Sequence, residues 1–112
     1  MLAGRVSSFI NVAGRKVQPG EVEQVLRLMP AVDDVRVVAV PDARRGEQVA
    51  ACVVASGALT VTAVRRHCAR RLAAHKIPRV VIFVDAIPMT ERGKTDERAV
   101  RALILANDGK PA

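Results

Sequence analysis

A lysine between a glycine and a threonine, at residues 93–95, is the feature of this sequence best suited to phosphate chemistry. Glycine-rich loops that cradle nucleotide phosphates also end in Gly-Lys-Thr, but they need another glycine five residues before Gly93. That position is Pro88, which has no backbone N–H to offer a phosphate. The spacing therefore argues against a loop of this type, and it predicts by itself that Lys94 lies in a solvated turn.

The number and spacing of the cysteines and histidines do not indicate a disulfide framework or a metal site. The two cysteines, Cys52 and Cys68, are too few for a disulfide framework or a zinc site. Both fall on apolar patterns, so we interpret them as small core residues. His67 and His75 have no Cys, Asp or second His at ligand spacing, and we expect no metal site.

The chain is strongly basic, with 18 Lys and Arg against 11 Asp and Glu and a net charge of +7. This balance favours an anionic partner such as a phosphorylated ligand, an acidic protein or nucleic acid. Two Phe, no Tyr and no Trp leave almost nothing on which a base could stack. The order of elements also shows no helix-turn-helix pair. We therefore expect no nucleic-acid partner, and a small DNA-binding protein stays the most distant alternative.

The elements that must position Lys94 are those of an α+β fold. We expect a small three-stranded mixed sheet with packed helices and a short N-terminal hairpin, in the order hairpin-α-β-β-α-β-α. The expected elements are the hairpin strands 9–12 and 15–18, a helix 19–29, strands 35–40 and 49–54, a helix from 60 to about 74, a strand 80–84 and a last helix capped by residue 95 or 96. The segment 49–84 should be a right-handed strand–helix–strand crossover.

One domain is expected over residues 1–107, followed by a flexible tail at 108–112 that contains Gly109 and Pro111. No apolar run approaches the roughly 18 residues that a membrane helix needs. The N-terminus does not resemble a secretory signal. We therefore expect a cytoplasmic protein without a membrane span.

Four segments, taken together and in this order, resemble the C-terminal domain of adenylate-forming enzymes. This superfamily contains acyl-CoA synthetases, peptide-synthetase adenylation domains and luciferases. Residues 4–23 resemble its eighth core motif, and residues 88–96, Pro-Met-Thr-Glu-Arg-Gly-Lys-Thr-Asp, resemble its tenth, P-x-T-x-x-G-K-x. Residues 38–47 resemble its V-x-V-P-D-x-x-x-G-E turn, and residues 73–79 resemble its L-A-x-x-K-x-P-R segment.

The resemblance implies a ligase reaction in two steps, with a large N-terminal adenylation domain as partner. A carboxylate attacks the α-phosphate of ATP and gives an acyl-adenylate and pyrophosphate. The small domain then rotates, and a thiol of CoA or phosphopantetheine attacks the adenylate. ATP and Mg²⁺ would be bound mainly by the N-terminal domain, on the same native chain or a separate one.

The same match implies a role for six residues of this chain. Lys94 would be the catalytic lysine of the first step, where its ammonium offsets negative charge in the transition state. Arg5 and Lys16 would bind the nucleotide, and Ala13 and Gly14 would line the path of CoA or pantetheine. Ser7 falls where the family usually has an acidic hinge residue, although a small polar residue can also absorb a backbone rotation.

Three questions stay open in the sequence. Residues 11–19 and 41–47 are more typical of acyl- or aryl-CoA ligases, whereas Thr95, Asp96 and Arg98 lean towards peptide synthetases, so the acceptor is either CoA or an acyl carrier protein. The chain could also be a freestanding domain that binds or regulates a partner protein. The arginines of the helix from residue 60 form either a solvated face or a docking surface for CoA phosphates or an acidic carrier protein; they are Arg65, Arg66, Arg70 and Arg71.

Overall fold

The N-terminal part of the chain forms a short hairpin and a helix in the computed structural model, which describes residues 9–108. Strand β1 (Ile10–Val12) pairs antiparallel with β2 (Arg15–Val17), and α1 (Pro19–Arg27) follows at once. Pro19 suits the first helical position because its missing N–H would have no intrahelical partner there. The predicted order of these elements is confirmed, and α1 ends two residues earlier than expected.

The central sheet is built on the long antiparallel pair β3 (Val32–Asp42) and β4 (Gly46–Ala55), and β5 (Val80–Phe83) lies parallel to β4. These three strands are the predicted mixed sheet. The hairpin joins them through a Val12–Gly46 pairing, so the strands form one five-stranded sheet. All of residues 49–53 are buried, because helices cover both faces of this strand and leave no polar side to alternate.

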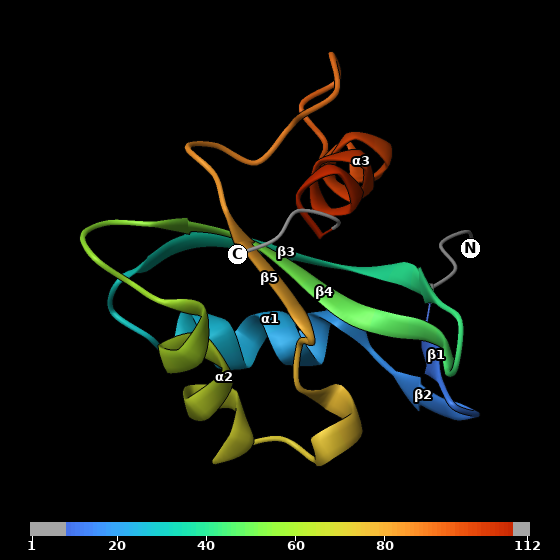
Figure 1. Cartoon of the computed structure of the whole chain (residues 1–112). Helices are drawn as coiled ribbons and strands as arrows, with labels where there is room; N and C mark the ends of the chain where they lie inside the picture. Colours follow the sequence, from blue (N-terminus) through green and yellow to red (C-terminus); the bar gives the residue numbers. More distant parts are fainter. Residues whose placement is uncertain (1–8, 109–112) are drawn as a thin grey trace, which may run out of the picture.

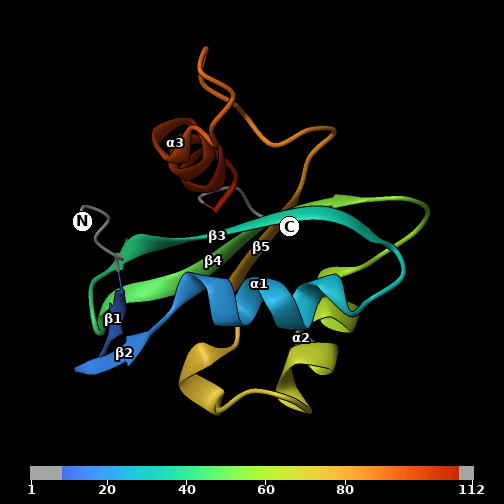
Figure 2. The same ribbon diagram turned by 180° about the vertical axis from the view of Figure 1, so that it is seen from behind.

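Helices cover the two faces of the sheet unequally (Figures 1 and 2). Helix α1 and helix α2 (Val61–Ala69) lie on one face, and α3 (Glu97–Asp108) lies alone on the other. The first face holds a core around Leu26, Val53 and Val64. The second core packs Val100 and Ile104 of α3 against the sheet and Ile87. Among residues 9–108, none of the helices has the length and apolar character that a membrane crossing requires.

Several predicted boundaries differ from the structure. Helix α2 stops at Ala69 rather than near residue 74, because the N–H groups of Arg71 and Leu72 both bond back to the Cys68 carbonyl and close the last turn. A short 3₁₀ helix, η1 (Ala74–Lys76), follows separately. Strands β3 and β4 are longer than their apolar runs, because their pairing continues through polar residues to Asp42 and Gly46. Helix α3 runs to Asp108, and residues 109–112 of the predicted tail lie outside the described part.

Candidate functional site

Lys94 lies on a tight hairpin between β5 and α3. The hairpin is closed by the pair Met89–Thr95 and by the Thr90 N–H, which donates to the Lys94 carbonyl at 2.6 Å. The Gly93 N–H donates to the Thr90 carbonyl at 3.0 Å, and Gly93 has a φ of +83°. A side chain at Gly93 would meet nothing within 4 Å, so glycine is required there by the backbone conformation and not by lack of space.

The base of this hairpin is fixed to the body of the domain. The Asp96 N–H donates to the Pro88 carbonyl at 2.9 Å, and the Asp96 carboxylate caps α3 by accepting the Ala99 N–H at 3.1 Å. Val100, one turn further, is fully buried. The Lys94 side chain itself is exposed, and within residues 9–108 it takes part in no ion pair. A rigid loop therefore carries an ammonium that is available to an outside anion.

Ala13 and Gly14 form the two-residue turn of the β1–β2 hairpin. Their φ angles are +52° and +85°, which is the conformation of a type I′ turn and the reason for glycine at the second position. Both residues are exposed, and a side chain on Gly14 would point into open space. Lys16 lies on β2 opposite Asn11, with its ammonium 5.5 Å from the centroid of the Phe9 ring.

The structure brings three of the predicted site residues together and keeps the fourth apart. Ala13, Gly14 and Lys16 share the β1–β2 hairpin at one end of the sheet, whereas the Lys94 hairpin projects from the other face, beyond α3 (Figure 1). The predicted nucleotide contact Arg5 and hinge residue Ser7 lie outside the described residues. The domain thus has two exposed loops that lie on different sides of the sheet.

Two motif residues have structural partners that sequence analysis missed. Lys76, the lysine of the segment 73–79, lies 3.0 Å from both carboxylate oxygens of Glu21 and ties η1 to the first turn of α1. Glu23 is only 6% exposed and accepts the Val37 N–H of β3 at 2.9 Å. The two glutamates thus have different partners, and Glu23 is a buried structural group.

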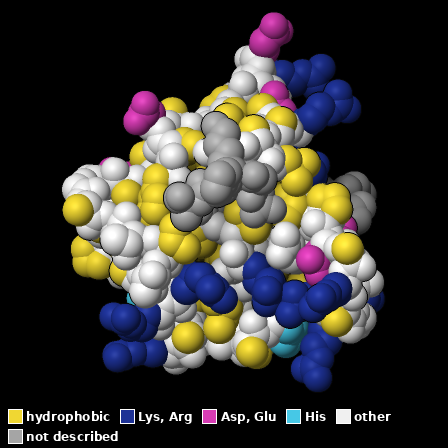
Figure 3. Space-filling view, in the orientation of Figure 1, with side chains coloured by type: hydrophobic (Ala, Val, Ile, Leu, Met, Phe, Trp, Pro, Cys, Tyr) yellow, Lys and Arg dark blue, Asp and Glu magenta, His cyan; other side chains and the backbone are white. Residues whose placement is uncertain are grey.

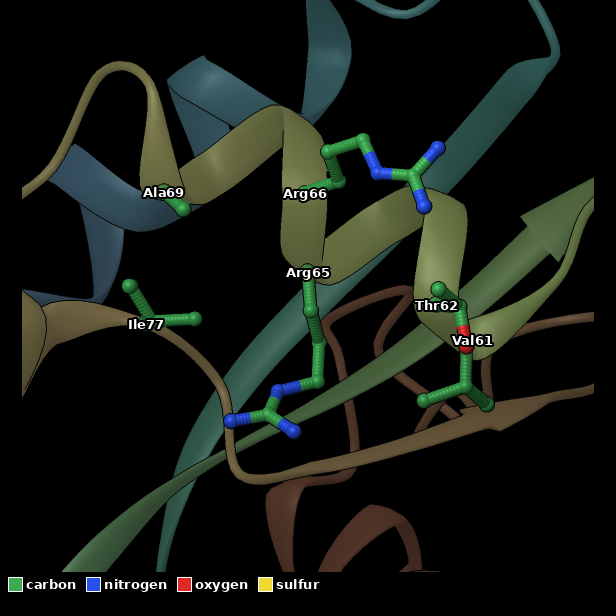
Figure 4. Close-up of a pocket in the computed structure, with 6 residues that line it drawn as sticks. All are labelled: Val61, Thr62, Arg65, Arg66, Ala69 and Ile77. Carbon is green, nitrogen blue, oxygen red and sulfur yellow. The ribbon is translucent and has the colours of Figure 1, made fainter.

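All four arginines of the predicted cluster are exposed, but only Arg65 and Arg66 lie on α2, because the helix ends at Ala69 before Arg70 and Arg71. Lys and Arg side chains gather across the lower part of the face shown in Figure 3, over α2 and the chain that leads to β5. A depression of about 340 Å³ lies here, and Arg65 extends across it towards the segment of Ile77, whereas Arg66 points away from that segment (Figure 4). The positive surface and the depression suit an anionic partner.

The two cysteines and His67 belong to the protein interior and not to a reactive site. Burial raises the pKa of Cys52 and of Cys68 to about 11, so both stay neutral thiols near pH 7. His67 Nε2 lies 2.7 Å from the Val25 carbonyl and links α2 to α1. Among the described residues, no group of His, Cys, Asp and Glu is arranged to hold a metal ion.

We expect both thiols to resist alkylation in the folded domain. Their raised pKa leaves on the order of one thiol in a thousand ionised at pH 8. The measurement is iodoacetamide labelling at pH 8 followed by mass spectrometry, with a sample in denaturant as the control that should label fully. Rapid labelling of either cysteine without denaturant would contradict its burial.

Comparison with known proteins identifies a family. The family model described as "AMP-binding enzyme C-terminal domain" matches residues 21–94. Triostin synthetase I of Streptomyces triostinicus is 40% identical over 108 residues, which are 95% of this chain and 20% of that protein. The 3-oxocholest-4-en-26-oate–CoA ligase of Rhodococcus rhodochrous is 42% identical over 99 residues, which are 87% of this chain and 18% of that protein.

A solved structure agrees with the relatives. The crystal structure of ATP-bound MatB from Rhodopseudomonas palustris superposes with a TM-score of 0.82 at 31% identity, over 87% of this chain and 20% of that one. The chain thus spans about a fifth of the length of each of these three proteins. These findings confirm the resemblance drawn from the four motifs: the chain belongs to the family of C-terminal domains of AMP-binding, adenylate-forming enzymes.

Proposed function

We propose that this chain is the mobile C-terminal domain of an ATP-dependent acid–thiol ligase, which joins a carboxylate to CoA through an acyl-adenylate. The observation that carries the proposal is the placement of the two exposed loops. The hairpin that carries Lys94 and the β1–β2 turn lie on different sides of the domain (Figures 1 and 2). Such a domain can serve two reaction steps if it rotates between them on a large N-terminal domain.

In the first step, Lys94 acts on the reacting phosphate. When the carboxylate attacks the α-phosphate of ATP, negative charge gathers on the phosphoryl oxygens and pyrophosphate leaves. The Lys94 ammonium offsets that charge, and its hairpin brings it there without reorganisation because the loop is closed by its own backbone bonds. Arg5 is proposed to contact the ribose or phosphates of the nucleotide.

In the second step, rotation about Ser7 replaces the Lys94 loop with the β1–β2 hairpin. The thiol attacks the acyl carbon, the bond to the adenylate oxygen breaks, and AMP leaves. Ala13 and Gly14 line the path of the pantetheine arm, where the open space around Gly14 leaves room for a narrow thiol. Lys16 approaches the adenylate phosphate with its exposed ammonium.

The residues of this domain are suited to bind phosphate groups but not Mg²⁺ or the acyl substrate. Its exposed lysines match anionic oxygens, whereas no acidic cluster among residues 9–108 suits Mg²⁺. We therefore assign the acyl pocket, most of the ATP site and Mg²⁺ to the N-terminal domain. MatB, the structural neighbour described above, is an ATP-bound protein about five times as long as the region it shares with this chain.

A carrier-protein phosphopantetheine is the second candidate acceptor. The exposed arginines of α2 favour it, because an acidic protein surface would be drawn to them. The complete ligase should then show a higher thioester yield with an acidic carrier protein than with CoA, and reversal of the arginine charges should abolish that preference. An unchanged ratio of carrier-protein use to CoA use after charge reversal would assign these arginines to a solvated face.

Taken alone, the chain should not release pyrophosphate from ATP. The substrates would have no pocket that positions them against Lys94, and positioning supplies a large part of any two-substrate rate. The measurement is carboxylate-dependent pyrophosphate release from the purified chain, with and without its N-terminal domain added. Ligase-like rates from the isolated chain would contradict the proposal, and binding to a different protein without any activity would favour a regulatory domain instead.

A further inference from the structure

The β3–β4 turn and the start of β4 contact three successive residues of the β1–β2 hairpin. The Asn11 N–H donates to the Glu47 carboxylate at 2.8 Å, and Val12 pairs with Gly46. The Ala13 N–H donates to the Arg45 carbonyl at 2.9 Å. Three successive hairpin residues thus meet the last turn residue and the first two residues of β4, and the contact with the turn is made by Ala13 itself.

The turn has its own internal support. The Asp42 carboxylate accepts the Arg45 N–H at 2.8 Å and lies 3.7 Å from the Arg45 guanidinium. Gly46 has a φ of +84°, and a side chain there would lie 3.9 Å from the Asn11 carbonyl, an ordinary contact distance. Glycine is therefore needed for the left-handed backbone, and Asp42 fixes the loop from which Glu47 emerges.

Glu47 supplies the side-chain contact in this arrangement. Buried apolar side chains anchor the strands of the hairpin, among them Ile10 and Val17, but the Ala13–Gly14 tip extends beyond them into solvent. A two-stranded hairpin is marginal by itself, so the position of its tip depends on what holds its edge. A carboxylate that accepts a backbone N–H makes a charge-assisted bond, roughly twice as strong as a neutral one.

We propose that Glu47 is a positioning residue for thioester formation, acting through the Asn11 N–H on the Ala13–Gly14 turn. The inference rests on the proposed function of that turn. Without the Glu47 carboxylate, the tip can shift relative to the sheet, and a displacement of about 1 Å can cost on the order of 100-fold in a step that depends on alignment. Adenylation is spared, because the Lys94 hairpin is anchored separately through Asp96 and α3.

The experiment uses the complete ligase and three variants. Glu47→Ala removes the acceptor, and Glu47→Gln keeps a neutral amide oxygen in its place. Asp33→Ala is the matched control, because Asp33 is also a carboxylate that accepts a hydrogen bond across β3 and β4, from the Ser56 hydroxyl at 3.3 Å, at the far end of the strands. Pyrophosphate exchange measures the first step, and thioester yield from supplied acyl-adenylate measures the second.

Glu47→Ala should slow the second step about 10- to 100-fold and change the first by less than about twofold. Glu47→Gln should recover part of the second step, and Asp33→Ala should change neither. Amide hydrogen exchange over residues 10–17 should accelerate in Glu47→Ala but not in Asp33→Ala. Amide hydrogen exchange measures the stability of the hairpin independently of enzyme activity. It therefore distinguishes a loosened hairpin from a loss of activity with another cause.

Equal losses in both steps, or faster exchange with an unchanged second step, would overturn the assignment of Glu47. The proposed function is tested separately in the same assays by Gly14→Leu. If Gly14→Leu leaves thioester formation intact, the role of the turn itself is wrong, and with it the step assigned to Glu47. If Gly14→Leu blocks thioester formation and Glu47→Ala does not, only the present inference fails.

Discussion

Lys94→Ala in the complete ligase should lower the rate of adenylation by about 10²- to 10³-fold, roughly 3 to 4 kcal/mol of transition-state stabilisation. The side chain is exposed, and within residues 9–108 it forms no ion pair, so its removal should leave the folded domain almost unchanged. The measurement is carboxylate-dependent pyrophosphate exchange, with the thermal unfolding midpoint of the variant recorded beside it.

Arg92→Ala is the matched control for this loss. Arg92 is an exposed cation two residues from Lys94 on the same hairpin, so its removal changes the charge of the loop equally. If the general positive charge of the loop mattered more than the position of the Lys94 ammonium, Arg92→Ala and Lys94→Ala would lower the adenylation rate equally. A chemically supplied acyl-adenylate should still be converted to thioester by Lys94→Ala, and failure of that conversion would show that Lys94 does not belong to the first step.

Gly14→Leu should block thioester formation, by about 100-fold or more if the side chain fills the thiol path, while adenylation continues. Within the described domain nothing lies within 4 Å of a Cβ added at Gly14. The internal cost of the leucine is backbone strain at a φ of +85°, about 1 to 2 kcal/mol. The measurements are pyrophosphate exchange for the first step and thioester yield for the second.

Gly57→Leu provides a control with the same backbone demand. Gly57 also has a φ of +85° and also has nothing within 4 Å of an added Cβ, but it lies between β4 and α2 and not on the hairpin. Strain alone would therefore damage both variants alike. Gly14→Asn adds less bulk and tolerates a positive φ better, so it should retain more thioester formation than leucine. Equal losses of both steps in Gly14→Leu would contradict a domain that alternates between two faces.

Much of the architecture could be predicted because local signals agreed with the final packing. The apolar-rich stretches 35–40 and 49–54 predict buried strands, and Pro19 and Thr60 mark helix starts that the structure contains, with Thr60 as a side-chain cap. The ends of elements were less predictable. Strand β3 extends to Asp42 because β4 lies beside it, and the partner of an individual polar residue cannot be read from its own neighbours in the chain.

The candidate site was also predictable only in part. Lys94, Ala13, Gly14 and Lys16 were singled out by the resemblance of their segments to the family's motifs, whereas spacing alone predicts only a solvated turn for Lys94. Their separation onto two sides of the domain could not be predicted, because it depends on the sheet that connects them. The role of Glu47 was also hidden, since its partner Asn11 lies 36 residues away.

The order of elements, the apolar faces and the conformational demands of the glycine turns can be read from the chain alone, because they follow from side-chain periodicity and backbone sterics over a few residues. The contacts of the charged residues, by contrast, depend on the folded arrangement. Glu23 becomes a buried acceptor for Val37, and Glu47 holds a hairpin, whereas Lys94 projects into solvent. The physical reason is that a charge is stabilised by whichever group folding brings within hydrogen-bond distance, and that group can come from anywhere in the chain.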